Sequence, residues 1–152
     1  MPPMRPYAGL HVGIAGRVLA GGVAAAVVAV LLVAARLQAD PRGHGTHTKL
    51  GMYPCGWVVA FDKPCPTCGM TTAFAHAADA HYLEAFHAQP MGAMLAIGAA
   101  GVFWGAAHVA ATGSRLGRVG ATMLGGRGLW TLAALTAAAW GYKVLTWPGA
   151  SG

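Results

Sequence analysis

The sequence predicts an all-α membrane protein with about three transmembrane helices and an amphipathic surface helix in the first loop. Of its 152 residues, 56% are hydrophobic and only 9% are charged, whereas about 25% are charged in soluble domains. The mean hydropathy is +0.52, and three apolar stretches are long enough to cross a hydrocarbon core about 30 Å thick. This composition excludes a soluble cytosolic enzyme and a disordered chain, and the length allows one domain.

The first predicted span, residues 18–35, is an uncharged run of Ala, Val, Leu and Gly between Arg17 and Arg36. The alternative interpretation is a cleaved signal peptide with Arg17 in its basic region. The segment before the run is long for a signal peptide, however, and the run exceeds the ~7–15 residues of a usual signal core. We therefore favour a retained helix that follows a cytoplasmic segment, residues 1–17.

The second and third predicted spans are residues 91–111 and 129–147. The second contains a single ionisable residue, His108, near its end. The third carries Lys143 in its last turn, where a long side chain can reach the membrane interface. It also has a tryptophan near each end, as expected for an aromatic belt. No charged residue lies at the midplane of any span, which argues against an ion pump or proton relay.

Gly101 and Gly105 form a small-xxx-small step in the second span. Such steps let helices approach closely, either within the chain or between copies. The alternative is that both glycines simply face lipid. The expected partners are therefore the lipid bilayer, a second copy of the chain, or a larger membrane complex. Basic and aromatic residues are not interleaved as they are in nucleic-acid-binding surfaces.

The distribution of charge predicts the orientation. Residues 1–17 carry two basic residues and no acid, and the loop 112–128 carries three and no acid. The loop 36–90 contains all four acidic residues of the chain, balanced by four basic ones. By the positive-inside rule, we expect the N-terminus and the loop 112–128 in the cytoplasm. The loop 36–90 and the tail 148–152 are then expected outside.

The loop 36–90 also holds all three cysteines and five of the seven histidines. Its second half predicts a helix over residues 70–87, with Thr71 or Thr72 as the N-cap. The dipeptide Gln89-Pro90 ends that helix, because a residue before proline is biased away from the α region.

The cysteines of this loop and the residues around them resemble the pattern of a known family. A cysteine at position 55, the string Cys-Pro-Thr-Cys-Gly from Cys65, a short amphipathic helix and Gln89-Pro90 before a span resemble the DUF2752 family of small bacterial membrane proteins. The resemblance extends from about Pro54 to the end of the second span. It implies a location in the bacterial inner membrane and a shared cysteine-rich site, and it implies no particular activity. The chain departs from the family pattern at Thr72, where Arg is usual, and at Gln89, where Asn is usual.

Cys55, Cys65 and Cys68 allow three interpretations. They can form a zinc site, with a histidine as the fourth ligand. They can form a disulfide, Cys65–Cys68 or Cys55 with one of them, which is favoured outside the cytoplasm. The odd thiol would then join two copies, carry a lipid or stay free. They can also be small buried residues without chemistry. A cysteine at a helix N-terminus has a lowered pKa, and Cys68 is the best placed for this effect.

Five ionisable residues of the predicted helix are candidate further ligands or polar partners: His76, Asp79, His81, Glu84 and His87. On one continuous helix, His76 can touch Asp79 and Glu84 can touch His87. His76 and His87 would lie about 16 Å apart along the axis and cannot share an ion. His81 falls in the apolar sector and is expected to be partly buried. A single Glu-x-x-His step is too little for a di-iron site.

The leading prediction is a non-enzymatic membrane protein whose cysteine cluster is a metal or redox-structural site at the outer face. The first alternative is a thiol–disulfide or metal-transfer enzyme that uses Cys65 and Cys68. The second is an accessory subunit of a larger membrane complex, in which the cysteines only hold a loop in place. A thioredoxin fold is excluded because the loop lacks the strands of a βαβ unit. The sequence names no substrate, and zinc is the candidate metal.

Overall fold

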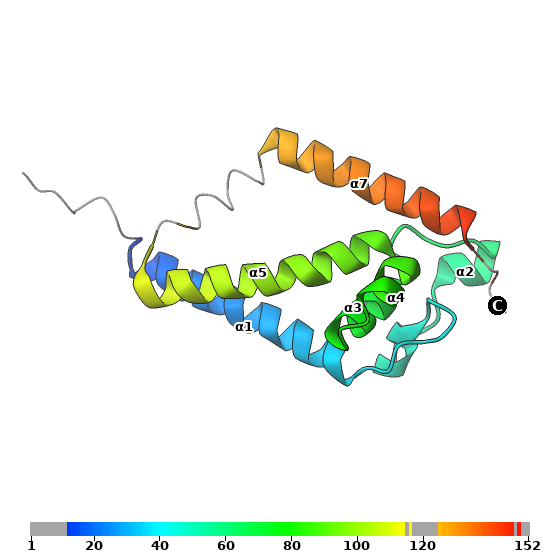
Figure 1. Ribbon diagram of the computed structural model, residues 1–152, viewed down its shortest axis with the longest axis horizontal. Coiled ribbons are helices and arrows are strands. Elements are labelled where there is room, and N and C mark those ends of the chain that lie inside the picture. Colours follow the sequence, from blue (N-terminus) through cyan, green and yellow to red (C-terminus); the bar gives the residue numbers. More distant parts are fainter. Residues whose placement is uncertain (1–11, 115, 117–124, 148, 150–152) are drawn as a thin grey trace, which may run out of the picture.

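The computed structural model describes residues 12–114, 116, 125–147 and 149. These residues form six α-helices and one 3-10 helix, and they contain no β-strand (Figure 1). The elements are α1 (Ile14–Arg36), η1 (Thr46–Leu50), α2 (Gly56–Phe61), α3 (Met70–Ala78), α4 (Tyr82–Ala88), α5 (Pro90–Thr112) and α7 (Gly126–Leu145). The predicted all-α class is confirmed.

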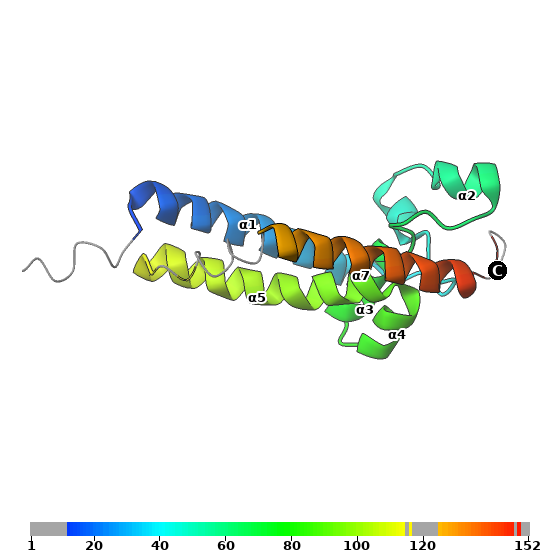
Figure 2. The same cartoon turned by 90° about the horizontal axis from the view of Figure 1, so that it is seen from above.

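Helices α1 and α5 lie side by side and antiparallel along the long axis of the molecule (Figures 1 and 2). Arg17, in the first turn of α1, ties the two helices together at one end. Its Nε donates to the carbonyl of Ala110 at 2.9 Å and its Nη2 to that of Ala111 at 2.8 Å. The negative C-terminal end of the α5 helix dipole also stabilises a positive charge at this position.

Both of these helices contain 23 residues and are apolar enough to cross a membrane. Only Ala24 and Ala34 are buried within α1. Large apolar side chains are exposed along both helices, among them Val18, Leu19, Val30, Leu32, Ile97 and Val102. A soluble protein rarely leaves so much contiguous apolar surface in water, so these two helices indicate a membrane protein.

A helix is also present at the third predicted span, but it differs in composition. Helix α7 contains 20 residues, Arg127 and Lys143 among them. Among the described residues, only α1 and α5 meet the length and hydropathy of a membrane span. Helix α7 runs along the same long axis and approaches α5 at the end that carries the short helices (Figure 1).

The short helices form a cap at one end of the α1–α5 hairpin. Its buried core is a cluster of alanines, Ala73, Ala85, Ala88 and Ala93, where α3 and α4 meet the start of α5. Small side chains let these helices approach closely. A Cβ atom at Gly92 would lie 3.0 Å from the Cβ of Ala73, closer than packed carbon atoms normally come.

The prediction of one helix over residues 70–87 is wrong. Helix α3 ends at Ala78 and α4 begins at Tyr82. Between them Ala80 has a φ of 60°, and the His81 N–H donates to the carbonyl of His76 at 2.9 Å. This is the Schellman end of a helix, in which the left-handed position is usually glycine. Because alanine occupies it here, the sequence carried no stop signal.

The prediction of Thr71 or Thr72 as the helix cap is also wrong. Helix α3 begins at Met70, directly after Gly69. Thr72 is fully buried, and its Oγ1 lies 2.8 Å from Oγ1 of Thr46 in η1. The Thr72 hydroxyl therefore joins the cap internally instead of capping a helix. This bond is the reason the residue tolerates complete burial.

Candidate cysteine site

All three cysteines line one pocket of about 340 Å³ in the cap. Cys55 stands directly before α2, and Cys65 and Cys68 belong to the loop that enters α3. His47, from η1, lines the same pocket. The predicted cysteine cluster is thus brought together from two segments of the chain, and all three thiols are free.

The loop that carries the second and third cysteines is held in two tight turns. The Cys68 N–H donates to the carbonyl of Cys65 at 2.9 Å, and the Met70 N–H donates to that of Thr67 at 3.1 Å. Between these turns Gly69 has a φ of 86°, a conformation that side chains other than glycine rarely adopt. The glycine therefore directs Cys68 into the cap and starts α3.

Cys68 is buried, with 7% of its surface exposed. Burial raises its pKa to about 11, and the neighbouring Cys65 adds to the rise, while the charge of Lys143 acts in the opposite direction. The sequence-based expectation of a lowered pKa at Cys68 is therefore wrong. Removal of water from the thiolate outweighs the helix dipole here. Cys68 is a protonated, inert thiol at neutral pH.

Cys55 behaves in the opposite way. Its burial alone would raise its pKa, but hydrogen bonds from the Val58 N–H, the Cys65 thiol and the Trp57 N–H outweigh burial and lower the pKa. Cys65 is half-buried, and its Sγ lies 3.4 Å from Oγ1 of Thr67. Cys55 and Cys65 are therefore adjacent thiols in the pocket, and the lowered pKa of Cys55 gives that thiol thiolate character.

None of the five candidate residues from the predicted helix lines the cysteine pocket. The rings of His76 and His81 lie 6.3 Å apart, and Nδ1 of His87 lies 3.4 Å from the hydroxyl of Tyr142. Asp79 and Glu84 are exposed. In the described part of the chain, no three His, Cys, Asp or Glu residues are arranged to hold a metal ion.

In the described part of the chain, neither His76 with Asp79 nor Glu84 with His87 forms an ion pair. The break between α3 and α4 changes the position of His81. His81 is exposed at the N-cap of α4, so its predicted partial burial, which assumed one continuous helix, is wrong.

Gly101 and Gly105 do not pack against another helix in the described part of the chain. A Cβ at Gly101 would have no atom within 4 Å, and one at Gly105 would meet only Leu116, at 3.9 Å. Helix packing at these glycines within the described residues is thus not found. Packing between copies stays a prediction.

Sequence reasoning missed the contacts of Lys143 within the protein, where it is 4% exposed. Its Nζ donates to the carbonyls of Gly43 at 3.1 Å and Ala88 at 2.9 Å. The same two carbonyls would lie 2.7 Å from a Cβ at Gly69. An isolated lysine at the end of an apolar stretch was the available signal for such contacts.

The segment before η1 contains a buried histidine. His44 is 6% exposed, its ring lies 4.6 Å from that of Trp147, and its Nε2 has no hydrogen-bond partner. Burial lowers the pKa of His44, and the charges of Arg42 and Lys143 add to this. The Arg42 guanidinium beside Asp40 holds the pKa of that carboxyl at about 2. The Arg42–Asp40 ion pair and the His44–Trp147 ring contact hold the loop that borders the cysteine pocket.

Residues 55–104 match the family model DUF2752, described as a protein of unknown function. The match starts at the first cysteine, contains all three cysteines and ends within α5. The resemblance predicted from the cysteine motif is therefore confirmed over this segment. Comparison of the chain with curated proteins and with solved structures gave no match.

Proposed function

We propose that this chain, whose residues 55–104 match DUF2752, is a three-span membrane protein that presents a redox-active Cys55–Cys65 pair at the outer membrane face. One observation carries the proposal: the two thiols are neighbours in a pocket at the end of the α1–α5 hairpin. Two adjacent thiols in an accessible pocket are the minimum for disulfide exchange.

The roles of the three cysteines follow from their surroundings. Cys55 is the attacking group, because its lowered pKa gives it thiolate character. Cys65 is the resolving thiol, because it lies beside Cys55. Cys68 is buried with a pKa of about 11 and takes no part. The reactive pair is then not the adjacent Cys-x-x-Cys pair of the sequence.

The exchange is a two-step transfer. The Cys55 thiolate attacks one sulfur of a disulfide in a partner protein, whose S–S bond breaks and whose second sulfur leaves as a thiolate. Cys65 loses its proton to solvent and attacks the Cys55 sulfur of the mixed disulfide. The partner leaves with both sulfurs reduced, and a Cys55–Cys65 disulfide is formed. Two electrons pass from the pair to the partner, and the reverse reaction oxidises a partner dithiol.

The arrangement of the long helices supports the topology. Helices α1, α5 and α7 run along one axis, and the cap lies at one end of all three (Figures 1 and 2). The cap contains all four acidic residues of the chain, which favours the side opposite the arginine-rich segments. Helix α7 is about 30 Å long, and the buried Lys143 binds the cap, so its charge does not oppose insertion. Helix α1 packs along α5 and is retained.

A metal centre at the same cysteines is the second candidate. His47 lines the pocket together with Cys55, Cys65 and Cys68, which supplies a Cys3His donor set of the kind that binds zinc. The donors would have to move together to share an ion. A role as an accessory subunit, or as a homo-oligomer through Gly101 and Gly105, is compatible with either chemistry.

Alkylation of the purified protein in detergent tests the dithiol proposal. At pH 7 about one Cys68 side chain in 10,000 is ionised with a pKa of about 11. We therefore expect Cys55 to be alkylated at least about a hundredfold faster than Cys68 by mass spectrometry. The rate for Cys55 should rise at lower pH than that for Cys68, because a lowered pKa moves ionisation to lower pH.

Oxidised glutathione then identifies the pair. The expected product is an internal Cys55–Cys65 disulfide. In a Cys65→Ser variant the reaction should stop at a mixed disulfide on Cys55, whereas Cys68→Ser, the matched control, should exchange like the wild type. A Cys65–Cys68 product would contradict the assignment. One zinc per chain, lost on Cys68→Ser, would establish the metal centre instead.

A further inference from the structure

A second groove, of about 400 Å³, adjoins the cysteine pocket. It lies between the last turns of α1 and the first turn of α3, and its lining includes Val33, Leu37 and Phe74. The groove and the cysteine pocket share Met70 and Thr71. The two cavities therefore adjoin at the first turn of α3.

The groove faces the hydrocarbon side of the molecule. Val30 and Val33 line it from α1, and they are 54% and 47% exposed on a candidate membrane span. Thr71 is the only polar side chain among the lining residues. The volume falls within the ~300–1,000 Å³ of small-molecule sites. An occupant of this groove is therefore an apolar molecule that enters from the bilayer.

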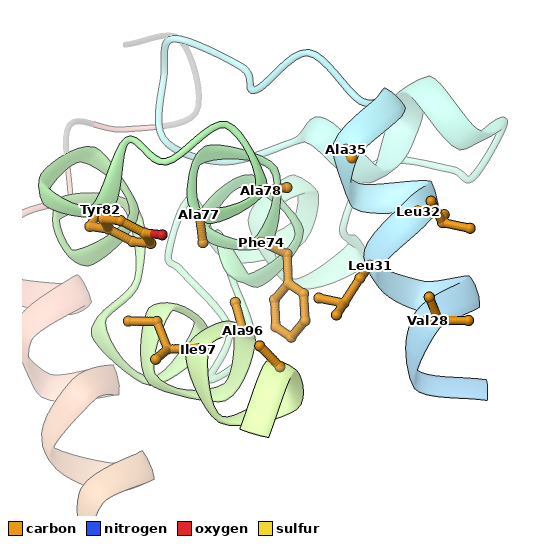
Figure 3. A pocket seen from close by; sticks show the side chains of 11 residues that line it. Val28, Leu31, Leu32, Ala35, Phe74, Ala77, Ala78, Tyr82, Ala96 and Ile97 are labelled. Atoms are coloured by element: carbon orange, nitrogen blue, oxygen red, sulfur yellow. The ribbon is translucent and has the colours of Figure 1, made fainter. Parts of the chain in front are cut away.

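The opposite flank of α1 carries another apolar groove, of about 500 Å³. Phe74 borders both grooves; Figure 3 shows it directed from α3 between α1 and α5, with Leu31 and Ala96 close to its ring. None of the residues that line this groove lines the cysteine pocket. It gives no route to the thiols, which makes it an internal control.

We infer that the groove beside the cysteine pocket binds a lipid-soluble quinone, which oxidises the Cys55–Cys65 dithiol. This inference rests on the proposed dithiol function and names its electron acceptor. Two S–H bonds break and one S–S bond forms. The two electrons and two protons convert the two carbonyls of the quinone to the hydroxyls of a hydroquinone, so the step balances.

The surroundings favour this occupant over other lipids. A dithiol needs a two-electron acceptor, and one that arrives through an apolar groove open to the bilayer must be lipid-soluble. Thr71 offers a hydroxyl to a quinone carbonyl at the boundary between groove and thiols. A phospholipid acyl chain can fill the groove but cannot accept electrons.

The test uses the full chain, reduced and kept in detergent without oxygen, with decylubiquinone as the probe. Val33→Trp fills the groove. Leu32→Trp is its matched control, because the neighbouring residue is 53% exposed and lines the other groove. We expect Val33→Trp to slow the formation of the Cys55–Cys65 disulfide at least about tenfold, a loss of about 1.4 kcal/mol. Leu32→Trp should stay within about twofold, and hydroquinone should form in step with the disulfide.

Oxidised glutathione separates the possible failures. This water-soluble oxidant should oxidise the wild type and both variants at equal rates, which also shows that the variants are folded. Val30→Trp, a second groove-filling variant, repeats the measurement if Val33→Trp is unstable. Equal quinone rates in the groove-filling and control variants would overturn the inference, as would glutathione oxidation without any quinone reaction. If neither oxidant joins Cys55 to Cys65, the proposed function itself fails.

Discussion

At the scale of single residues, Gly69 lies where two backbone carbonyls of the cap come close to its Cα. The carbonyls of Gly43 and Ala88 converge on its Cα, and both accept a hydrogen bond from Lys143. The loop before η1, the end of α4, the cysteine loop and α7 therefore meet at one point. A side chain at position 69 would separate these segments and move Cys68.

Gly69→Ala should destabilise the protein by about 3 kcal/mol. The left-handed backbone costs a side chain about 1–2 kcal/mol, and a Cβ at 2.7 Å from two carbonyl oxygens adds the cost of overpacking. Gly51→Ala is the matched control, because its φ is 78° and a Cβ there would meet no atom within 4 Å; it should cost only about 1 kcal/mol. Denaturation in detergent measures both. Equal losses would show that the close approach has no energetic weight.

Cys65 and Cys68 also show that the surroundings of a single residue decide its properties. Spacing predicts that Cys65 and Cys68 act together, since they lie one turn apart. Burial separates them, because Cys68 is buried and Cys65 is only half-buried, although both line the pocket with Cys55. The pKa of a thiol depends on how far burial removes it from water and on the hydrogen-bond donors around it. Neither can be read from the spacing of cysteines in the sequence.

At the scale of elements, α7 is joined to the cap by polar bonds. The indole N–H of Trp140 donates to the carbonyl of Pro64 at 3.0 Å, and that of Trp147 to the carbonyl of Asp62 at 3.1 Å. Lys143 adds its two bonds at the same end. These contacts fix the C-terminal end of α7 against the cysteine-bearing cap.

Lys143→Met should cost about 2–3 kcal/mol of stability. The substitution keeps the apolar stem but leaves the carbonyls of Gly43 and Ala88 without the ammonium, and an unsatisfied buried acceptor costs about 1–3 kcal/mol. Lys49→Met is the control, because Lys49 is exposed and makes one bond, to the carbonyl of Gln38 at 2.8 Å; it should change stability by less than about 0.5 kcal/mol. Thermal denaturation in detergent distinguishes them. A neutral Lys143→Met would mean that α7 docks by its indoles alone.

At the scale of the whole molecule, polar and charged groups lie at the two ends of the long helices. The polar cap lies at one end of the long helices (Figure 2), and Arg17 lies at the other end, bound to the end of α5. The two ends therefore suit opposite faces of a bilayer, and the proposed orientation puts the thiols on the face where disulfides persist.

Reporter fusions test this orientation. A reporter fused after Gly152 should be extracytoplasmic, and one fused after Ser114 should be cytoplasmic, because the proposed third span separates the two points. Paired alkaline phosphatase and fluorescent-protein fusions give opposite signals at each point. A cytoplasmic signal at Gly152 would contradict the third span, and an extracytoplasmic signal at Ser114 would invert the whole orientation.

The sequence alone determined the helical class, the apolar stretches and the grouping of the cysteines in one loop. These properties are read from composition and periodicity because they depend on the number of apolar residues and on their order along the chain. The family match over residues 55–104 is likewise a property of residue order.

Only the tertiary structure decided where α3 ends, in which direction the pKa values of Cys55 and Cys68 shift and where Lys143 lies. Each of these depends on contacts between segments that are distant in the chain. Ala80 adopts a left-handed conformation although alanine gives no signal for it. Lys143 tolerates burial because two carbonyls from other segments accept its hydrogen bonds. Burial and hydrogen bonding exist only after the segments have packed, so the chemistry of the site is set at that level.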